Sequence, residues 1–153
     1  MRLDGKVALV TGAGPMGAAI ARRFAEEGAA LVLTDISGAR LQATADELAP
    51  KTPLVAHRAD VTAREEALGV AEAGLAAFGR VDILCNIVGG VRDAVLYQPL
   101  LTMSEKRWDE TFAINLKASL HLIQRLAPGM VERGAGKILN VSSVNYAGEA
   151  GSS

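Results

Sequence analysis

The chain has 153 residues, half of them hydrophobic and 22% charged, which supports one buried core and excludes an intrinsically disordered chain. Its formal net charge of −1 leaves no basic surplus, so nucleic acid is not an expected partner. The single cysteine, Cys85, excludes an internal disulfide and has no companion at metal-ligand spacing, so no metal site is expected and a reducing cytoplasm fits. No apolar run approaches the ~18 residues of a membrane span, and no membrane partner is expected.

Five short apolar runs alternate with longer segments of helical period. The runs predict strands at residues 6–11, 30–35, 53–58, 81–86 and 137–142. Helices are predicted over residues 16–28, 37–48, 62–78 and 104 to about 127. The nearly continuous apolar character of the runs indicates strands that are buried on both faces. We therefore expect one domain over residues 1–153, with an α/β fold in which helices cover both faces of a doubly wound parallel sheet.

Residues at the expected helix ends agree with this assignment. Thr62 and Glu65 have the spacing of a capping box, and Ser104 is a suitable first residue for the longest helix. Gly28 and Gly79 stand where helices should end, because glycine adopts the left-handed conformation there without a Cβ clash.

A glycine-rich segment, residues 11–17 (TGAGPMG), joins the first strand to the first helix. A diphosphate needs backbone N–H donors at close range, and Gly12, Gly14 and Gly17 remove the side chains that would obstruct it. Met16 lies within the same turn. The context predicts a dinucleotide-binding loop of the Rossmann type; the alternative is an ordinary tight turn.

An acidic residue, Asp35, ends the second strand, where a Rossmann carboxylate accepts hydrogen bonds from the adenosine ribose hydroxyls. A 2′-phosphate would be repelled there, and Arg40, a helical turn further on, is a distant cation that the carboxylate outweighs. NAD is therefore the expected cofactor, with Ile36 as a neighbouring contact. The alternative is that Asp35 caps the next helix, a role that Ser37 could also fill.

Four further segments follow in order: residues 59–62 (ADVT), 86–89 (NIVG), 113–117 (AINLK) and 140–143 (NVSS). Together with the glycine loop they resemble the short-chain dehydrogenase/reductase family over the whole chain. The resemblance implies that Asp60 accepts from the adenine amino group and that the Val61 amide binds the ring. It also implies cofactor contacts for Asn86, Val88 and Gly89.

The same resemblance implies two catalytic residues. Ser143 would orient the substrate oxygen, and Asn115 would hold a water that relays protons. Each short match has a simpler alternative, since Asp60 could cap a helix, Asn86 could satisfy loop backbone groups and residues 142–143 could form a turn.

Two departures from the family pattern stand out. The glycine loop is one residue shorter than the family's Thr-Gly-x-x-x-Gly-x-Gly. The family's Tyr-x-x-x-Lys pair is expected just past Ser153, and Tyr146 does not replace it because Ala150 stands four residues on. We therefore expect a C-terminally incomplete fold that is the N-terminal part of a longer dehydrogenase.

The resemblance implies an NAD-dependent oxidoreductase that interconverts an alcohol and a ketone or aldehyde. A noncatalytic NAD-binding fragment, or a lyase or epimerase on the same scaffold, are the alternatives. The partner would be a small carbonyl or alcohol substrate, with residues 90–103 and 144–153 beside it. The helix from Ser104 implies a homodimer or homotetramer by resemblance.

Overall fold

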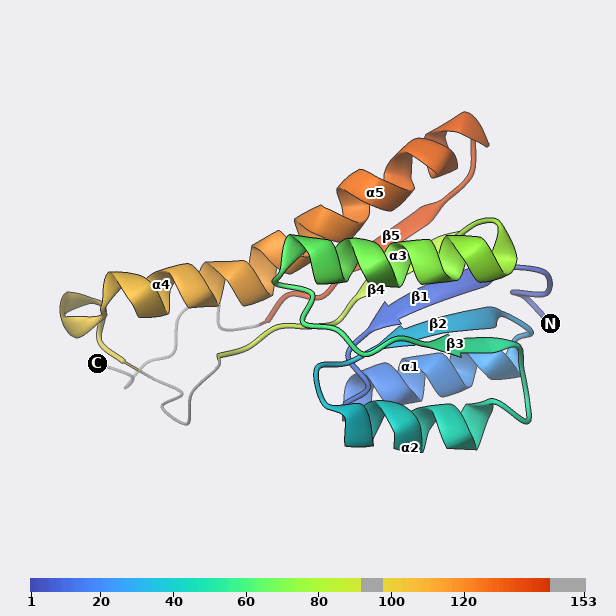
Figure 1. Cartoon of the computed structure of the whole chain (residues 1–153), viewed down its shortest axis with the longest axis horizontal. Helices are drawn as coiled ribbons and strands as arrows, with labels where there is room; N and C mark the ends of the chain where they lie inside the picture. The colour runs from blue at the N-terminus through green and yellow to red at the C-terminus, as the bar shows by residue number, and fades with distance from the viewer. Residues whose placement is uncertain (92–97, 144–153) are drawn as a thin grey trace.

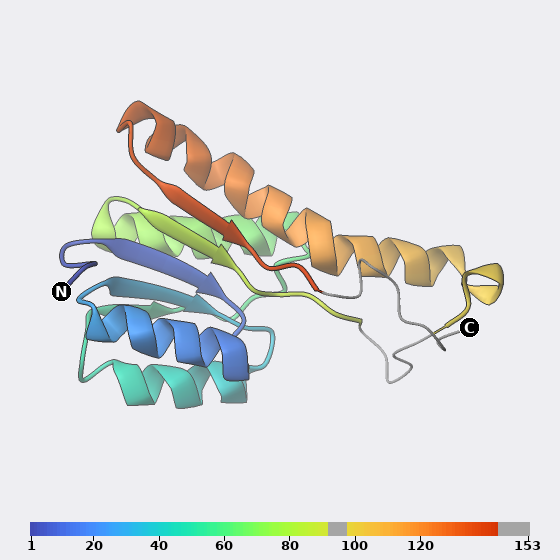
Figure 2. The same cartoon turned by 180° about the vertical axis from the view of Figure 1, so that it is seen from behind.

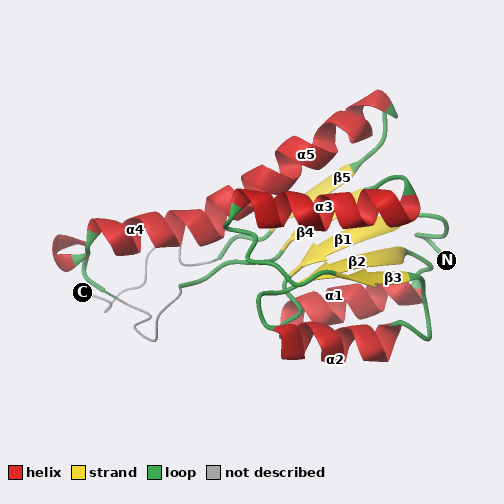
Figure 3. Ribbon diagram, viewed as in Figure 1, coloured by secondary structure: helices red, strands yellow, loops and turns green. Residues whose placement is uncertain are grey.

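A sheet of five parallel strands forms the centre of the computed structural model, which describes residues 1–91 and 98–143 (Figure 3). The strands are β1 (Val7–Thr11), β2 (Ala30–Thr34), β3 (Leu54–Ala56), β4 (Ile83–Asn86) and β5 (Lys137–Asn140), in the order β3-β2-β1-β4-β5. The chain moves outward from β1 to β3 and then returns to the other side of β1. The predicted doubly wound parallel sheet is confirmed, with strands somewhat shorter than the apolar runs.

Helices cover both faces of this sheet, as predicted (Figure 1). One face carries α1 (Pro15–Glu26) and α2 (Gly38–Leu48), and the other carries α3 (Arg64–Phe78) and α5 (Ala118–Glu132) (Figure 2). Alternate residues of β1 supply the two cores: Ala8 and Val10 pack toward α1 and α2, and Val7 and Leu9 toward α3 and α5. Because β1 is buried on both faces, its sequence does not alternate between apolar and polar residues.

The capping box predicted at Thr62 and Glu65 is wrong. Helix α3 begins one residue later than that pattern requires, and no side chain caps it. The Thr62 hydroxyl instead donates to Asp60 Oδ1 at 2.7 Å, and the backbone N–H of Asp60 donates to Glu66 Oε2 at 2.7 Å. The polar side chains therefore brace the turn before the helix. At the other end, Gly79 has φ 74°, which confirms the predicted left-handed cap.

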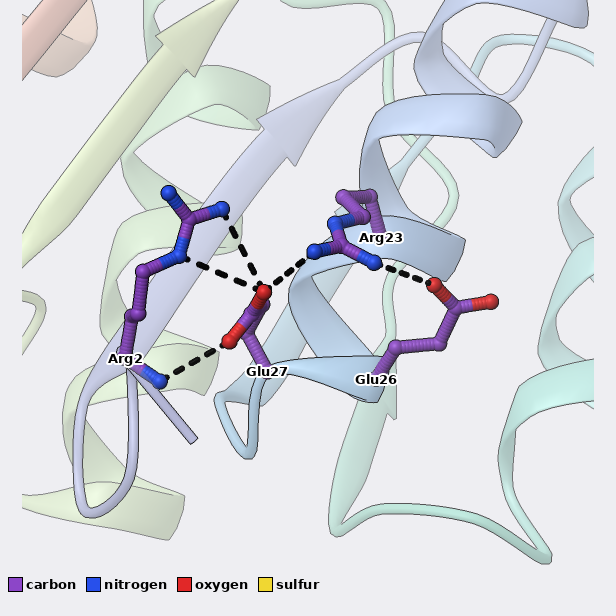
Figure 4. Close-up of polar contacts among 4 residues, drawn as sticks. All are labelled: Arg2, Arg23, Glu26 and Glu27. Carbon is purple, nitrogen blue, oxygen red and sulfur yellow. Dashed lines mark hydrogen bonds and ion pairs between the residues drawn. The ribbon is translucent and has the colours of Figure 1, made fainter.

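The N-terminal segment is tied to the end of α1 (Figure 4). Glu27 accepts from the Arg2 backbone N–H at 2.9 Å and from Arg2 Nε at 3.3 Å, and it also pairs with Arg23. Arg23 reaches Glu26 as well, at 3.1 Å. The hydrogen bond from the Arg2 backbone outweighs burial and lowers the pKa of Glu27 below its ordinary value. Gly28 follows with φ 91°, as expected for a helix end.

The long helix that was predicted from Ser104 is divided in the structure into three consecutive helical segments. Ser104 caps α4 (Glu105–Phe112), and its hydroxyl accepts from the Arg107 N–H at 3.2 Å. A π-helical turn, η2 (Ala113–Lys117), then joins α4 to α5. Helix α5 continues past the predicted end through Pro128 because its last turn is held by packing, with Met130 only 5% exposed. Helix α4 projects beyond the sheet (Figure 1).

A short 3-10 turn, η1 (Leu100–Thr102), precedes α4. Residues 92–97 and 144–153, expected to contribute to the substrate site and including Tyr146, lie outside the described residues. Within residues 1–91 and 98–143, none of the helices combines the length and apolar character needed to cross a membrane.

Candidate functional site

A cavity of about 640 Å³ opens at the carboxyl ends of the strands. It lies next to the boundary between β1 and β4, where the order of the strands reverses: β2 and β3 are on one side of β1, and β4 and β5 are on the other. This point is the usual ligand site of a doubly wound sheet. Ten of the eleven predicted cofactor residues line it: Gly12, Gly14, Met16, Gly17, Asp35, Ile36, Asp60, Val61, Val88 and Gly89. The fold therefore brings together predicted residues up to 77 positions apart, from Gly12 to Gly89.

The glycine loop is closed by a backbone contact. Gly12 has φ 84°, and its N–H donates to the Thr34 carbonyl oxygen at 2.7 Å. A Cβ on Gly17 would lie 1.7 Å from the Gly12 carbonyl oxygen, so only glycine fits there. A Cβ on Gly14 would meet nothing within 4 Å. Gly14 precedes the first turn of α1, and its open side leaves room for a ligand against the helix N-terminus.

Asp35 is a buried carboxylate with four hydrogen bonds. Oδ1 accepts from the Ser37 N–H at 2.7 Å and from Arg40 Nη2 at 2.8 Å. Oδ2 accepts from the Ala13 N–H at 2.7 Å and from Arg40 Nε at 3.3 Å. Burial alone would raise the pKa of Asp35, but the bonds from Arg40, Ser37 and Ala13 outweigh it and lower the pKa. Ser37, and not Asp35, caps α2, by accepting from the Arg40 N–H.

The turn before α3 also lines the cavity. Asp60 Oδ1 accepts from both the N–H and the hydroxyl of Thr62, at 3.0 and 2.7 Å. Val61 is buried, and its carbonyl oxygen lies 3.4 Å from His121 Nδ1 on α5. Ile36 lines the same cavity and is 48% exposed. Ile36 and Val61 thus give this end of the cavity two apolar sides.

Thr11 has a role near the cavity that its place in the sequence does not indicate. Its hydroxyl oxygen accepts from the N–H groups of Ile87 and Val88, at 2.9 and 3.2 Å. The first strand therefore fixes the turn that follows β4. Only the pairing of β1 with β4 reveals this role, because nothing in the spacing of the two segments indicates that they are neighbours.

Asn86 is the one predicted cofactor residue that does not line the cavity. It is 3% exposed, and its Nδ2 donates to Asn140 Oδ1 at 2.8 Å. Asn86 Oδ1 has no hydrogen-bond partner among the described residues. The side chain therefore connects β4 to β5, the strand that leads to Ser143.

A second cavity, of about 850 Å³, adjoins the first and contains both predicted catalytic residues, Asn115 and Ser143. The two cavities share four lining residues: Met16, Ile87, Val88 and Gly89. A ligand that extends from the glycine loop across this shared wall would reach the surroundings of Asn115 and Ser143.

Asn115 lies in the π-helical turn and is heavily hydrogen-bonded. Its Nδ2 donates to the carbonyl oxygens of Gly90 and Thr111, both at 2.8 Å, and its Oδ1 accepts from the Gly90 N–H at 2.9 Å. Both amide hydrogens are thereby used. One lone pair of Oδ1 remains to accept from a water or a substrate.

Comparison with known proteins identifies the family. A family model described as short chain dehydrogenase matches residues 6–152. The chain is 38% identical to the (2S)-[(R)-hydroxy(phenyl)methyl]succinyl-CoA dehydrogenase subunit BbsD of Thauera aromatica, covering 99% of this chain and 60% of that protein. It is also 38% identical to the 3-oxoacyl-[acyl-carrier-protein] reductase FabG of Thermotoga maritima, covering 94% of this chain and 58% of the relative. The chain thus spans somewhat more than half the length of these relatives.

Solved structures agree. A metagenomic short-chain oxidoreductase in complex with NADP superposes with a TM-score of 0.85 at 38% identity, covering 94% of this chain and 65% of that one. A short-chain dehydrogenase/reductase of Burkholderia phymatum in complex with NAD gives a TM-score of 0.84 at 34% identity, covering 94% and 51%. The chain belongs to the short-chain dehydrogenase family.

Proposed function

We propose that residues 1–153 are the cofactor-binding domain of a longer NAD-dependent oxidoreductase that interconverts an alcohol and a ketone or aldehyde. The observation that carries this proposal is the Asp35 carboxylate at the end of β2, which lines the same cavity as the glycine loop. A carboxylate there accepts hydrogen bonds from a ribose diol and repels a 2′-phosphate. Relatives named as dehydrogenases and reductases support the reaction class.

The residues fit a dinucleotide. The cavity volume of about 640 Å³ lies within the range of cofactor sites. Gly14 leaves open space at the N-terminus of α1 for a diphosphate, while Ile36 and Val61 offer apolar sides to an adenine. We assign Asp60 and the Val61 amide to adenine recognition. Val88 and Gly89 would support the nicotinamide half, and Asn86 would act indirectly by holding β4.

The proposed chemistry is carbonyl reduction or the reverse. When bound, the reduced form of the cofactor would supply the hydride for carbonyl reduction, and the oxidised form would accept it in the reverse reaction. In the reduction, negative charge develops on the substrate oxygen, and a hydroxyl that donates to this oxygen stabilises the charge. The proton that completes the alcohol would come from the tyrosine of the family's Tyr-x-x-x-Lys pair, which is expected past Ser153. We assign that donor role to Ser143 and assign Asn115 to holding a water through its remaining lone pair. The substrate would be a small carbonyl or alcohol compound bound in the second cavity.

We further propose that the protein acts as a homodimer or homotetramer in the cytoplasm. Four exposed apolar side chains at intervals of four residues support self-association: Trp108, Phe112, Leu116 and Leu120. Such a stripe on consecutive helical turns is a contact face for a second helix. The buried single cysteine, Cys85, is compatible with a reducing compartment.

The test of the cofactor assignment is calorimetric titration of the protein with NAD and with NADP. Asp35→Ala should weaken NAD binding by about tenfold, because the ribose hydroxyls lose their acceptor, and should weaken NADP binding less. Equal losses for the two cofactors would contradict the role of Asp35. In the full-length enzyme, Ser143→Ala should lower turnover while the affinity for NAD stays nearly unchanged; unchanged turnover would contradict the role of Ser143.

A further inference from the structure

The Asp35 carboxylate has no acceptor position left for a ribose hydroxyl. A carboxylate offers about four lone-pair positions, and the N–H groups of Ala13 and Ser37 and the two nitrogens of Arg40 fill four. A ribose diol therefore has to replace one of these donors before Asp35 can bind it.

Arg40 is the donor that can leave. The Ala13 and Ser37 N–H groups are backbone atoms fixed by the glycine loop and by the start of α2. The Arg40 side chain is 55% exposed, whereas that of Asp35 is 5% exposed. An ion pair with one solvated partner is weak enough to be exchanged. The buried carboxylate still needs donors after the exchange, and two ribose hydroxyls would supply them.

A second guanidinium lies next to Ile36, which lines the cavity, although Arg58 itself is not a lining residue. Arg58, which follows β3, donates from Nε to the carbonyl oxygen of Ile36 at 2.9 Å. Its Cδ is 3.5 Å from the position of a Cβ on Gly38, the first residue of α2. Arg40 therefore bonds to Asp35, and Arg58 bonds to Ile36, the next residue in the chain. The spacing in the sequence does not indicate this second cation, because Arg58 lies after β3, 22 positions from Ile36.

The two arginines change the electrostatics of the ribose end. A lone Asp35 would repel the two negative charges of a 2′-phosphate. Here the positive charge of Arg40 already neutralises the negative charge of the Asp35 carboxylate. Arg58, which bonds to the neighbouring residue Ile36, adds a second positive charge. Guanidinium groups suit phosphate because their planar donors match its oxygens.

We propose that Arg40 is a specificity-determining residue: it competes with the ribose hydroxyls of NAD for Asp35 and, together with Arg58, neutralises the 2′-phosphate of NADP. This inference rests on the proposed function. The domain then binds both cofactors, with a smaller preference for NAD than Asp35 alone would impose. Removal of the Arg40 charge should move the two affinities in opposite directions, which no purely structural role predicts.

The experiment is calorimetric titration of the full chain with NAD and with NADP, using the wild type and three variants. Arg40→Met should tighten NAD about threefold, since Asp35 is released, and weaken NADP about tenfold, since the cation is lost. Arg58→Met should weaken NADP about threefold and leave NAD unchanged. Arg22→Met removes a similar two-pronged pair with Glu47 on the outer surface of α1 and α2, and should change neither affinity.

Arg40→Lys covers the case in which Arg40→Met unfolds, because lysine keeps the charge without the fork of donors. It should retain most of the NADP affinity and gain NAD affinity. If the wild type binds NAD but the NAD to NADP ratio is unchanged in both Arg40 variants, the role of Arg40 is overturned and the proposed function stands. If the wild type binds neither cofactor, the proposed function fails, and this inference fails with it.

Discussion

The side chain of Asn115 bonds to both backbone polar atoms of Gly90: its Oδ1 accepts from the N–H at 2.9 Å, and its Nδ2 donates to the carbonyl oxygen at 2.8 Å. The same Oδ1 would lie 2.9 Å from a Cβ on Gly89. The π-helical turn that carries Asn115 is thereby fastened to the segment after β4. This contact fixes one wall of the second cavity.

Replacement of Asn115 by leucine should therefore loosen that wall. Two tertiary hydrogen bonds are lost, each with a net contribution of about 1 kcal/mol, so the free energy of unfolding should fall by about 1 to 2 kcal/mol. Urea denaturation followed by circular dichroism measures this change. Glu132→Gln, at the exposed end of α5, is the control and should leave the midpoint unchanged. An unchanged midpoint for Asn115→Leu would mean that the Gly90 contacts do not stabilise the fold.

Two glycines of the same loop should respond differently to alanine. Gly17→Ala places a methyl group 1.7 Å from the Gly12 carbonyl oxygen, so the loop has to move and stability should fall by at least ~2 kcal/mol. Gly14→Ala meets nothing within 4 Å and has an ordinary φ of −70°, so the melting temperature should stay nearly constant.

The two alanine variants also separate folding from binding. The methyl group that Gly14→Ala adds would stand in the proposed diphosphate space. The variant should therefore have normal stability but an affinity for NAD that is lower by about tenfold. Thermal unfolding and calorimetric titration of the same samples give both quantities. Full NAD affinity in Gly14→Ala would place the diphosphate elsewhere.

Local sequence signals predicted the sheet and most helices because each signal has a local cause. The continuous apolar run of β1 reflects burial on both faces, and the left-handed φ of Gly79 reflects a helix end that needs no Cβ. The glycine loop was recognisable for the same reason. Its Gly17 contact lies within the motif itself, only five positions from Gly12.

Contacts between distant segments were not predictable in this way. Arg40 stands one helical turn from Asp35 and was treated as a distant cation, yet its side chain folds back onto the carboxylate. Thr11 meets the turn after β4 only because β1 and β4 are neighbours in the sheet. The capping box at Thr62 failed because α3 begins only at Arg64, so Thr62 is not the residue before the helix and instead bonds to Asp60 within the turn. Each outcome depends on tertiary geometry that a local pattern does not contain.

The single cysteine predicts a loss of stability at alkaline pH. Burial raises the pKa of the Cys85 thiol to about 11, from 9.0 for an accessible thiol. A pKa that is raised in the folded state favours folding below the unfolded pKa, and this contribution disappears as the pH rises toward 11. A pKa difference of about two units corresponds to about 3 kcal/mol at most. Stability should therefore fall between about pH 9 and pH 11.

Cys85→Ala isolates this effect. The variant has no thiol to ionise, so its stability curve between pH 8 and pH 11 should be flatter than that of the wild type, although it starts lower because the buried side chain is smaller. Denaturant titrations at several pH values measure both slopes. Parallel curves for the two proteins would show that Cys85 does not contribute to the alkaline transition.

The apolar stripe on α4, η2 and α5 predicts self-association. Trp108 and Phe112 lie with ring centroids 4.7 Å apart and are 46% and 41% exposed, and the stripe continues through Leu116, which is 58% exposed. A charged side chain in the middle of such a contact would be buried without a partner, which is costly. Phe112→Glu should therefore convert a dimer or tetramer of the 153-residue chain into a monomer near 15.9 kDa in sedimentation velocity. Leu101→Glu, at a residue that is 99% exposed outside the stripe, is the matched control and should leave the assembly intact. A wild-type protein that sediments as a monomer would remove the stripe as an oligomer interface, and dissociation by both variants would point to a general effect of charge.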